Sequence, residues 1–278
     1  MERGLLDAHG GDEEPRERDL ALWQERGWGL SLPSYAWSRS VSYYDSGPDE
    51  YARRSEALDS MLRERTCPMP PEPDPSAITL PDPHDWEASS LGDAITKRRS
   101  VGAFRPNKTD QEALATLLHH GTSKIRECRR HLSGEDPHNL LISVGAAFDV
   151  YVLIYSVQGM VPGAYLYEQE SGALSSRQVG NLRESVRAAL AGQPDPTNVA
   201  ATVLLVVDFD RYQWRYRHER ALRNLYLECG RLMQPLILVA TSLGLQTGIT
   251  PAIRDHLVGA MLGLDLGNWQ ALHSLTIS

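Results

Sequence analysis

Hydrophobic positions change their spacing along the chain, and this spacing predicts where helices and strands lie. The runs Val150–Tyr155 and Thr202–Val207 are apolar at nearly every position, which is typical of strands buried on both faces. The longest helical periodicity runs from about Glu219 to Leu243 and contains Pro235, where we expect a kink or a break. Further helices are expected at Ser90–Arg99, Thr109–His119, Val179–Leu190 and Arg254–Leu262, a hairpin at Gly159–Leu174 and a closing strand at Ala271–Ile277.

The N-terminal part of the chain has a different pattern. Residues 1–18 are acidic and unpatterned, so we expect them to lie disordered ahead of the fold. An aromatic-rich stretch follows, with a helix predicted at Glu50–Arg65, and residues 67–83 are too rich in proline for a helix or a central strand. The sequence therefore predicts a tail at 1–18, an arm and linker at 19–84, and one domain at 85–278.

Composition narrows the class of protein. With 278 residues, 41% of them hydrophobic, the chain can bury a full core as one large domain, or as one domain with an extension. A formal net charge of -8 argues against a protein that binds nucleic acid by neutralising phosphates. The N-terminus lacks an apolar signal core, and no run of 18 apolar residues occurs, so we expect neither export by that route nor a membrane span.

Cysteine and histidine spacing indicates neither a disulfide framework nor a metal site. Cys67, Cys128 and Cys229 stand far apart without a CxxC pair, and the simplest compartment for such a protein is the reducing cytoplasm. His119 and His120, with His131 and His138, lack ligand spacing on one helical face. We therefore expect no bound metal.

Three segments carry candidate chemistry, and each also has a structural interpretation. Arg98, Arg99 and Ser100 end a predicted helix, where two guanidiniums and a hydroxyl can hold a phosphate; a solvated basic turn explains them equally well. The small residues of Ser143–Ala147 precede a strand and allow backbone amides to approach a flat ring; a tight turn with a packed alanine face is the alternative. The charged and aromatic segment 208–223 leads into the long helix, as an ordinary surface loop would also do.

In their order and spacing these segments resemble the nitroreductase superfamily, and most closely its SagB-type dehydrogenases. The resemblance rests on Arg98-Arg99-Ser100, on Ser143-Val-Gly-Ala-Ala with the hairpin Gly159-Met-Val-Pro-Gly-Ala-Tyr165, and on Asp208-Phe-Asp-Arg211. It covers about residues 85–278 and, more loosely, 20–84. It implies an α+β fold with a central, mostly antiparallel sheet flanked by helices, in a homodimer whose flavin sites lie across the interface and whose N-terminal arm wraps the partner subunit.

The resemblance also implies a flavin mononucleotide (FMN) site. The phosphate and ribityl chain would contact Arg98, Arg99 and Ser100, and the isoalloxazine ring would lie against the segment near Gly145. The full set of cofactor-binding candidates is Arg98, Arg99, Ser100, Ser143, Gly145, Ala146, Arg220, Arg223 and Gly248. Gly102 stands where many members have another arginine, and Asp149 stands where the SagB-type pattern has proline.

The activity implied is oxidation of an azoline ring in a peptide to an azole. Related enzymes use a neighbouring lysine and tyrosine to remove a ring proton; here these positions are Arg215 and Tyr216, and His218 is the nearby group that titrates near neutral pH. Arginine stays protonated, so Arg215 is a candidate to lower the pKa of Tyr216 or to bind a carboxylate. The alternatives are an NAD(P)H-dependent nitro or flavin reductase, and a non-catalytic subunit that partners a cyclodehydratase.

Overall fold

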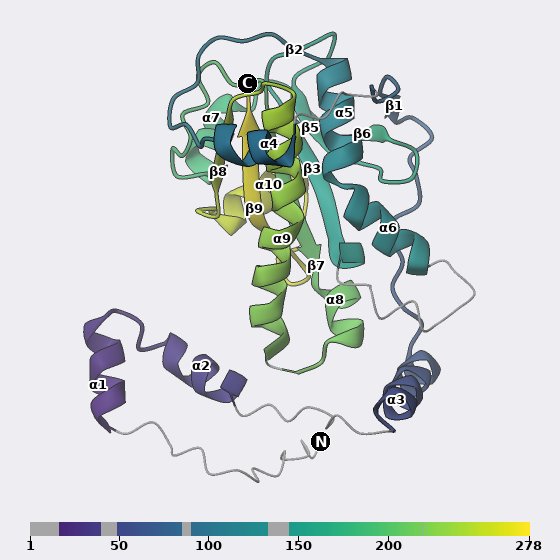
Figure 1. Ribbon diagram of the computed structural model, residues 1–278, viewed down its shortest axis with the longest axis vertical. Helices are drawn as coiled ribbons and strands as arrows, with labels where there is room; N and C mark the ends of the chain where they lie inside the picture. Colours follow the sequence, from purple (N-terminus) through teal and green to yellow (C-terminus); the bar gives the residue numbers. More distant parts are fainter. Residues whose placement is uncertain (1–16, 40–48, 85–89, 133–144, 219) are drawn as a thin grey trace.

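The protein folds around a seven-stranded sheet whose neighbouring strands are all antiparallel (Figure 1). The computed structural model describes residues 17–39, 49–84, 90–132, 145–218 and 220–278. The strand order is β1-β6-β5-β3-β7-β9-β8, and a small parallel pair, β2 and β4, lies apart from the sheet. The strands are β1 (Ile78–Thr79), β2 (Thr109–Asp110), β3 (Phe148–Ile154), β4 (Val157–Gln158), β5 (Gly163–Tyr167), β6 (Ala173–Val179), β7 (Ala201–Asp208), β8 (Thr247–Thr250) and β9 (Trp269–Ile277).

Helices cover both faces of the sheet and produce three layers. They are α1 (Glu17–Glu25), α2 (Ser31–Arg39), α3 (Glu50–Glu64), α4 (Leu91–Lys97), α5 (Gln111–Gly121), α6 (Ser123–Leu132), α7 (Arg183–Ala189), α8 (Phe209–Arg215), α9 (Arg220–Ser242) and α10 (Asp255–Leu262). Helices α5 and α9 pack with Val150 and Val152 of β3 on one face, whereas α7 and α10 pack with Tyr151 and Leu153 on the other. Alternate residues of β3 thus enter different cores, because successive side chains of a strand point to opposite faces.

The N-terminal arm lies largely outside these layers. In Figure 1 helices α1, α2 and α3 lie below the sheet, where α3 contacts α8 and α2 contacts the long helix α9. The linker that follows α3 contributes the two-residue edge strand β1, which pairs with β6. Helix α1 begins at Glu17 and so takes up the last two residues of the segment that we expected to precede the fold. Residues 1–16 lie outside the described residues.

The predicted α+β fold with a mostly antiparallel sheet is confirmed, and one local prediction is wrong. Residues 179–182 do not begin a helix: β6 extends to Val179, Gly180 turns the chain with a φ of 138°, and α7 starts at Arg183. Of the kink or break expected at Pro235, the break is excluded, because the 23-residue helix α9 runs continuously through this residue. Proline cannot donate to the carbonyl four residues earlier, which belongs to the exposed Arg231, where water can take over that hydrogen bond.

Candidate functional site

One edge of the sheet brings together four candidate residues, Arg98, Arg99, Ser100 and Gly248. About half of the chain separates the first three from Gly248. Ser100 forms a parallel bridge with Thr247, and the Thr247 hydroxyl donates to the carbonyl of Arg99 at 2.8 Å. A Cβ on Gly248 would lie 3.0 Å from the carbonyl oxygen of the residue that follows Ser100. We call these four residues the edge group.

The edge group has the donors that a phosphate needs. Arg99 and Ser100 are exposed and Arg98 is half-buried. Arg99 donates from Nη1 to the carbonyls of Thr96 and Arg98, at 2.6 and 2.7 Å, and so closes the C-terminal turn of α4. Across the described ranges neither arginine forms an ion pair with a carboxylate. Their remaining guanidinium donors therefore fit an anionic group at this edge.

Gly145 and Ala146 lie directly before β3, and contacts within the chain account for the small size of Gly145. A Cβ on Gly145 would lie 2.9 Å from the sulfur of Cys128, to which the backbone N–H of Gly145 donates. Ala146 is 2% exposed. The position that a side chain of Gly145 would take is thus filled by helix α6, as the packed-turn interpretation expects. Ser143 lies outside the described residues.

The end of α8 and the segment that follows it contain the proton-transfer candidates, and we call Tyr216, Arg215 and His218 the proton-transfer group. The Tyr216 ring stacks on Tyr212, with 5.0 Å between centroids, and the Arg215 guanidinium lies over its face, 5.4 Å from the centroid. The Tyr212 hydroxyl donates to the carbonyl of Ala221 at 2.7 Å, which ties α8 to the first turn of α9. The Tyr216 ring therefore contacts two neighbours, Tyr212 and Arg215.

Histidine is the proton acceptor in this group that needs no activation at neutral pH. Burial, followed by the positive charge of Arg220, lowers the pKa of His218 below 6.5. At pH 7 its imidazole is therefore neutral and can accept a proton. Arg220 is half-buried beside it, whereas Arg223, one helical turn further along α9, is exposed.

Sequence reasoning missed a buried ionic network that lies behind the proton-transfer group. Asp149 accepts from Arg129 of α6 at 2.6 Å through one carboxylate oxygen and pairs with Arg211 of α8 through the other. Arg211 also donates from Nε to Asp208 at 2.8 Å, and from Nη1 to the Ala146 carbonyl at 3.1 Å. Burial opposes the charge of Arg211, but Asp149 and Asp208 more than compensate and raise the pKa of Arg211. An aspartate within an otherwise apolar strand was the available signal.

The edge group and the proton-transfer group lie at opposite ends of the sheet. Strand β3 pairs with β7 so that Phe148 faces Val207, beside α8, and Ile154 faces Ala201. Ala201 also pairs with Ile277, which in turn pairs with Thr247 of the edge group. Since β3 rises about 3.3 Å per residue, roughly 20 Å separate the two ends. One chain therefore does not place Arg98 and Arg99 next to Gly145 or Tyr216.

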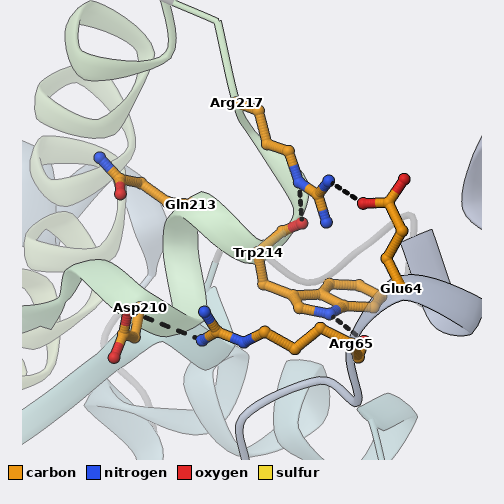
Figure 2. Close-up of a pocket in the computed structure, with 6 residues that line it drawn as sticks. All are labelled: Glu64, Arg65, Asp210, Gln213, Trp214 and Arg217. Carbon is orange, nitrogen blue, oxygen red and sulfur yellow. Dashed lines mark hydrogen bonds and ion pairs between the residues drawn. The ribbon is translucent and has the colours of Figure 1, made fainter. Parts of the chain in front are cut away.

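The described residues line two clefts. The first, of about 450 Å³, lies between the end of α3 and helix α8 (Figure 2). There Trp214 donates from Nε1 to the Arg65 carbonyl at 2.7 Å, and Arg217 pairs with Glu64 at 2.6 Å, so the cleft is the junction between arm and domain. The second, of about 370 Å³, begins at Pro251, directly after β8, and is lined on its other side by Tyr226 of α9. Its size is that of small-molecule sites.

The described residues contain no group of histidine, cysteine and acidic side chains that could hold a metal ion. Among the helices that the structure describes, none combines the length and the apolar composition of a membrane span. The three cysteines are free. Burial raises the pKa of Cys229, beside the second cleft, to about 12, so this thiol is not a nucleophile at neutral pH.

Comparison with known proteins yields one family. The model of the nitroreductase family matches residues 95–277. The trifolitoxin operon protein TfxC of Rhizobium leguminosarum bv. trifolii is 25% identical over 252 residues, which cover 85% of this chain and 68% of that protein.

Two solved structures resemble the fold. One is a nitroreductase-like protein of Anabaena variabilis, with a TM-score of 0.60 and 21% identity, covering 85% of this chain. The present chain spans about half, 49%, of that protein. The other is the Escherichia coli microcin synthetase complex McbBCD with truncated pro-microcin bound, with a TM-score of 0.51 and 15% identity, covering 89% of this chain and 96% of the matched one. At these identities the likeness concerns the fold alone.

Proposed function

The chain belongs to the nitroreductase family, and on this premise we propose that it is an FMN-dependent, SagB-type dehydrogenase that oxidises azoline rings to azoles in a ribosomally made peptide. The family consists of flavin-dependent oxidoreductases in general. TfxC belongs by name to a trifolitoxin operon, and the microcin synthetase structure contains a truncated pro-microcin; both support a peptide substrate. The proposal assigns the flavin-binding domain to residues 85–278 and the reaction to the cytoplasm.

The observation that carries the proposal is the packing of Tyr216 against Tyr212 and Arg215 at the end of α8. An azoline becomes an azole by losing two hydrogens, one as a proton and one as a hydride. Flavin, when bound, accepts the hydride. The protein must accept the proton, and Arg215 cannot do so because a guanidinium stays protonated. The Tyr216 phenol and the neutral imidazole of His218 are the groups that remain.

We further propose that each active site combines the edge group of one chain with the proton-transfer group of a second copy. The edge group would hold the FMN phosphate through Arg98, Arg99 and Ser100. The second cleft, which starts at Pro251, three residues after Gly248, and is lined along β9 by Gln270 to His273, offers room for the ring system. The partner would contribute Tyr216 and His218, with Arg220 and Arg223 on the first turns of its α9. Leu222, Tyr226 and Leu227 are 44%, 50% and 69% exposed on α9 and provide an apolar surface for the second copy.

The activity is tested with purified protein and an azoline-containing peptide in the absence of nicotinamide. The expected results are a yellow preparation that releases FMN on denaturation and a peptide that loses two daltons. Tyr216→Phe should abolish turnover and leave FMN bound, because the phenol is assigned to proton transfer alone. Unchanged turnover in Tyr216→Phe removes this residue from the reaction, and His218→Gln then tests the imidazole.

The shared site is tested with mixed dimers. One chain carries Arg98→Ala with Arg99→Ala, and the other carries Tyr216→Phe; each is inactive alone under the proposal. A mixed dimer then contains one site with all the changes and one with none, so activity should return to about half of the wild-type value per dimer. A site built within one chain predicts no recovery, and that result would refute the two-chain arrangement.

Two observations favour a second candidate, a non-catalytic subunit that partners a cyclodehydratase. Cys128 fills the space beside Gly145, and an arginine stands at the position of the expected lysine. A colourless preparation that ignores added FMN, and that increases the activity of a cyclodehydratase, would support this candidate. Reduction of a nitro compound that requires NAD(P)H would instead support a general nitro or flavin reductase.

A further inference from the structure

Four buried charges link three segments behind the proton-transfer group. Arg211 is 6% exposed, Arg129 9%, Asp149 3% and Asp208 8%. Burying charges is costly, and replacing a buried ion pair by apolar residues of similar volume is often neutral or stabilising. Stability alone therefore gives little reason for this network. Its contacts have in common that they fix the relative positions of backbone segments.

Arg211 is the residue through which these segments are joined. Its backbone N–H donates to the Asp208 side chain at 3.1 Å, which caps α8. Its guanidinium holds Asp149 at the start of β3 and donates to the Ala146 carbonyl at 3.1 Å. Arg129 secures the same strand end from α6 by donating to the Phe148 carbonyl at 2.6 Å. The planar guanidinium of Arg211 thus contacts strand β3 and the segment before it and joins both to α8.

The proton-transfer group is connected to this anchor by one short helix. Helix α8 has seven residues, and Arg211 lies in its first turn, one turn before Arg215. Tyr212, next to Arg211, contacts the Tyr216 ring and the Ala221 carbonyl. A displacement of Arg211 therefore moves α8 as a unit and shifts Tyr216 relative to the sheet.

We propose that Arg211, held between Asp149 and Asp208, is a positioning residue that sets the place of Tyr216 relative to the β3 end of the sheet. The inference rests on the proposed function only in so far as Tyr216 takes part in the reaction. Asp149 stands where the SagB-type pattern has proline, so this chain secures the strand end with a carboxylate. Arg211 acts through α8 and need not touch the substrate.

The test replaces Arg211 by lysine, which keeps the charge but has no planar fork to hold two carboxylates and a carbonyl together. A matched control is Arg183→Lys, because Arg183 also donates to two backbone carbonyls, those of Pro196 and Val199, in the opposite layer. Arg211→Lys should lower kcat for the azoline peptide about 100-fold and change KM and FMN content less than about twofold, as expected for a misplaced reacting group. The control should stay within about twofold in all three.

A second measurement does not depend on activity. With 3-fluorotyrosine at position 216, the fluorine resonance of the wild-type protein should be single and sharp, because the ring is packed against Tyr212 and Arg215. Arg211→Lys should shift or broaden it, and Arg183→Lys should leave it in place. Asp149→Asn should have the same effect as Arg211→Lys, since asparagine has nearly the same shape as aspartate but lacks its charge. This second variant replaces Arg211→Lys in the test if Arg211→Lys fails to fold.

The outcomes separate this inference from the proposed function. If the wild-type protein oxidises no azoline, the proposed function fails, and the fluorine spectrum still decides whether Arg211 positions Tyr216. If Arg211→Lys and Asp149→Asn fold and both keep the wild-type resonance and kcat, the positioning role is overturned. A fall in stability with an unchanged resonance and kcat would identify the network as purely structural and would also overturn the proposal.

Discussion

Gly145→Ala tests whether this glycine is small because of a ligand or because of the chain's own packing. The added Cβ would lie 2.9 Å from the Cys128 sulfur, 3.4 Å from the Cys128 Cβ and 3.5 Å from the Lys124 carbonyl oxygen. The first distance is too short for a stable contact, so β3 and α6 must separate by several tenths of an ångström. We therefore expect a loss of stability with little change in FMN binding.

The magnitude follows from two opposing effects. Overpacking a well-filled interior costs about 1–3 kcal/mol. Removing a glycine restricts the unfolded chain, which stabilises the protein by about 0.4–1 kcal/mol where the backbone geometry suits alanine. Gly145 is not among the glycines with positive φ, so alanine can adopt its backbone conformation. The net expectation is a free energy of unfolding lowered by about 1–2 kcal/mol.

The assay is urea unfolding of four proteins: wild type, Gly145→Ala, Cys128→Ala and the double variant. Cys128→Ala alone should cost about 1 kcal/mol, because it deletes one buried sulfur. In the double variant the two Cβ atoms would be 3.4 Å apart, an ordinary contact, so its loss should be smaller than the sum of the two single losses by about 1 kcal/mol. FMN titration of the same proteins should give affinities within about twofold of each other.

A different result would refute the packing argument. If Gly145→Ala unfolds like the wild type, loses FMN affinity and is not rescued by Cys128→Ala, then the glycine is small in order to admit the cofactor. The isoalloxazine ring would in that case belong beside β3, as the resemblance to the SagB-type dehydrogenases implies, and the second cleft would lose its assignment.

Three further predictions concern the core, the arm and pH. Leu114→Ala should lower the free energy of unfolding by about 2–5 kcal/mol in urea unfolding, because Leu114 is 0% exposed in the core formed with α9. Trp214→Phe should lower it by about 1 kcal/mol and speed limited proteolysis of the linker, because the hydrogen bond to Arg65 is lost; unchanged cleavage would show that other contacts hold the arm. Burial lowers the pKa of His273 below 6.5, so the unfolded state binds that proton more readily; stability should be fully present above pH 6.5 and fall as the pH is lowered through the folded pKa. His273→Gln should make that decline shallower.

The sequence predicted best the strands whose side chains all face the same kind of environment, the buried interior. Strands β3 and β7 are apolar throughout because both faces are covered by helices, and that burial is directly visible in their sequence. Helix α8 was missed because its residues mix charges with aromatics. Its buried charge, Arg211, is compensated by Asp208 three residues earlier and by Asp149, which lies 62 residues earlier. A partner at that separation has no local signature.

The sequence was enough to select candidate residues by their chemical type, but it did not predict how they are arranged in space. The contact between Ser100 and Thr247 depends on where β8 joins the sheet, which neither local sequence specifies. Gly145 illustrates the opposite difficulty, because a small residue fits both a bound ring and a neighbouring side chain. Only the position of Cys128 distinguishes these explanations.

The separation of the two groups follows from the antiparallel sheet and so does not depend on side-chain detail. Strand β7 runs from the end of the sheet that holds the edge group to the end that holds α8, and α9 then returns along it. A 23-residue helix is about 35 Å long, so closing the distance within one chain would require the core between α9 and the sheet to come apart. A second copy related by a twofold axis can instead place its α8 end beside the first chain's edge group without any such change. The same fold that separates these residues within one chain therefore favours a site shared between two.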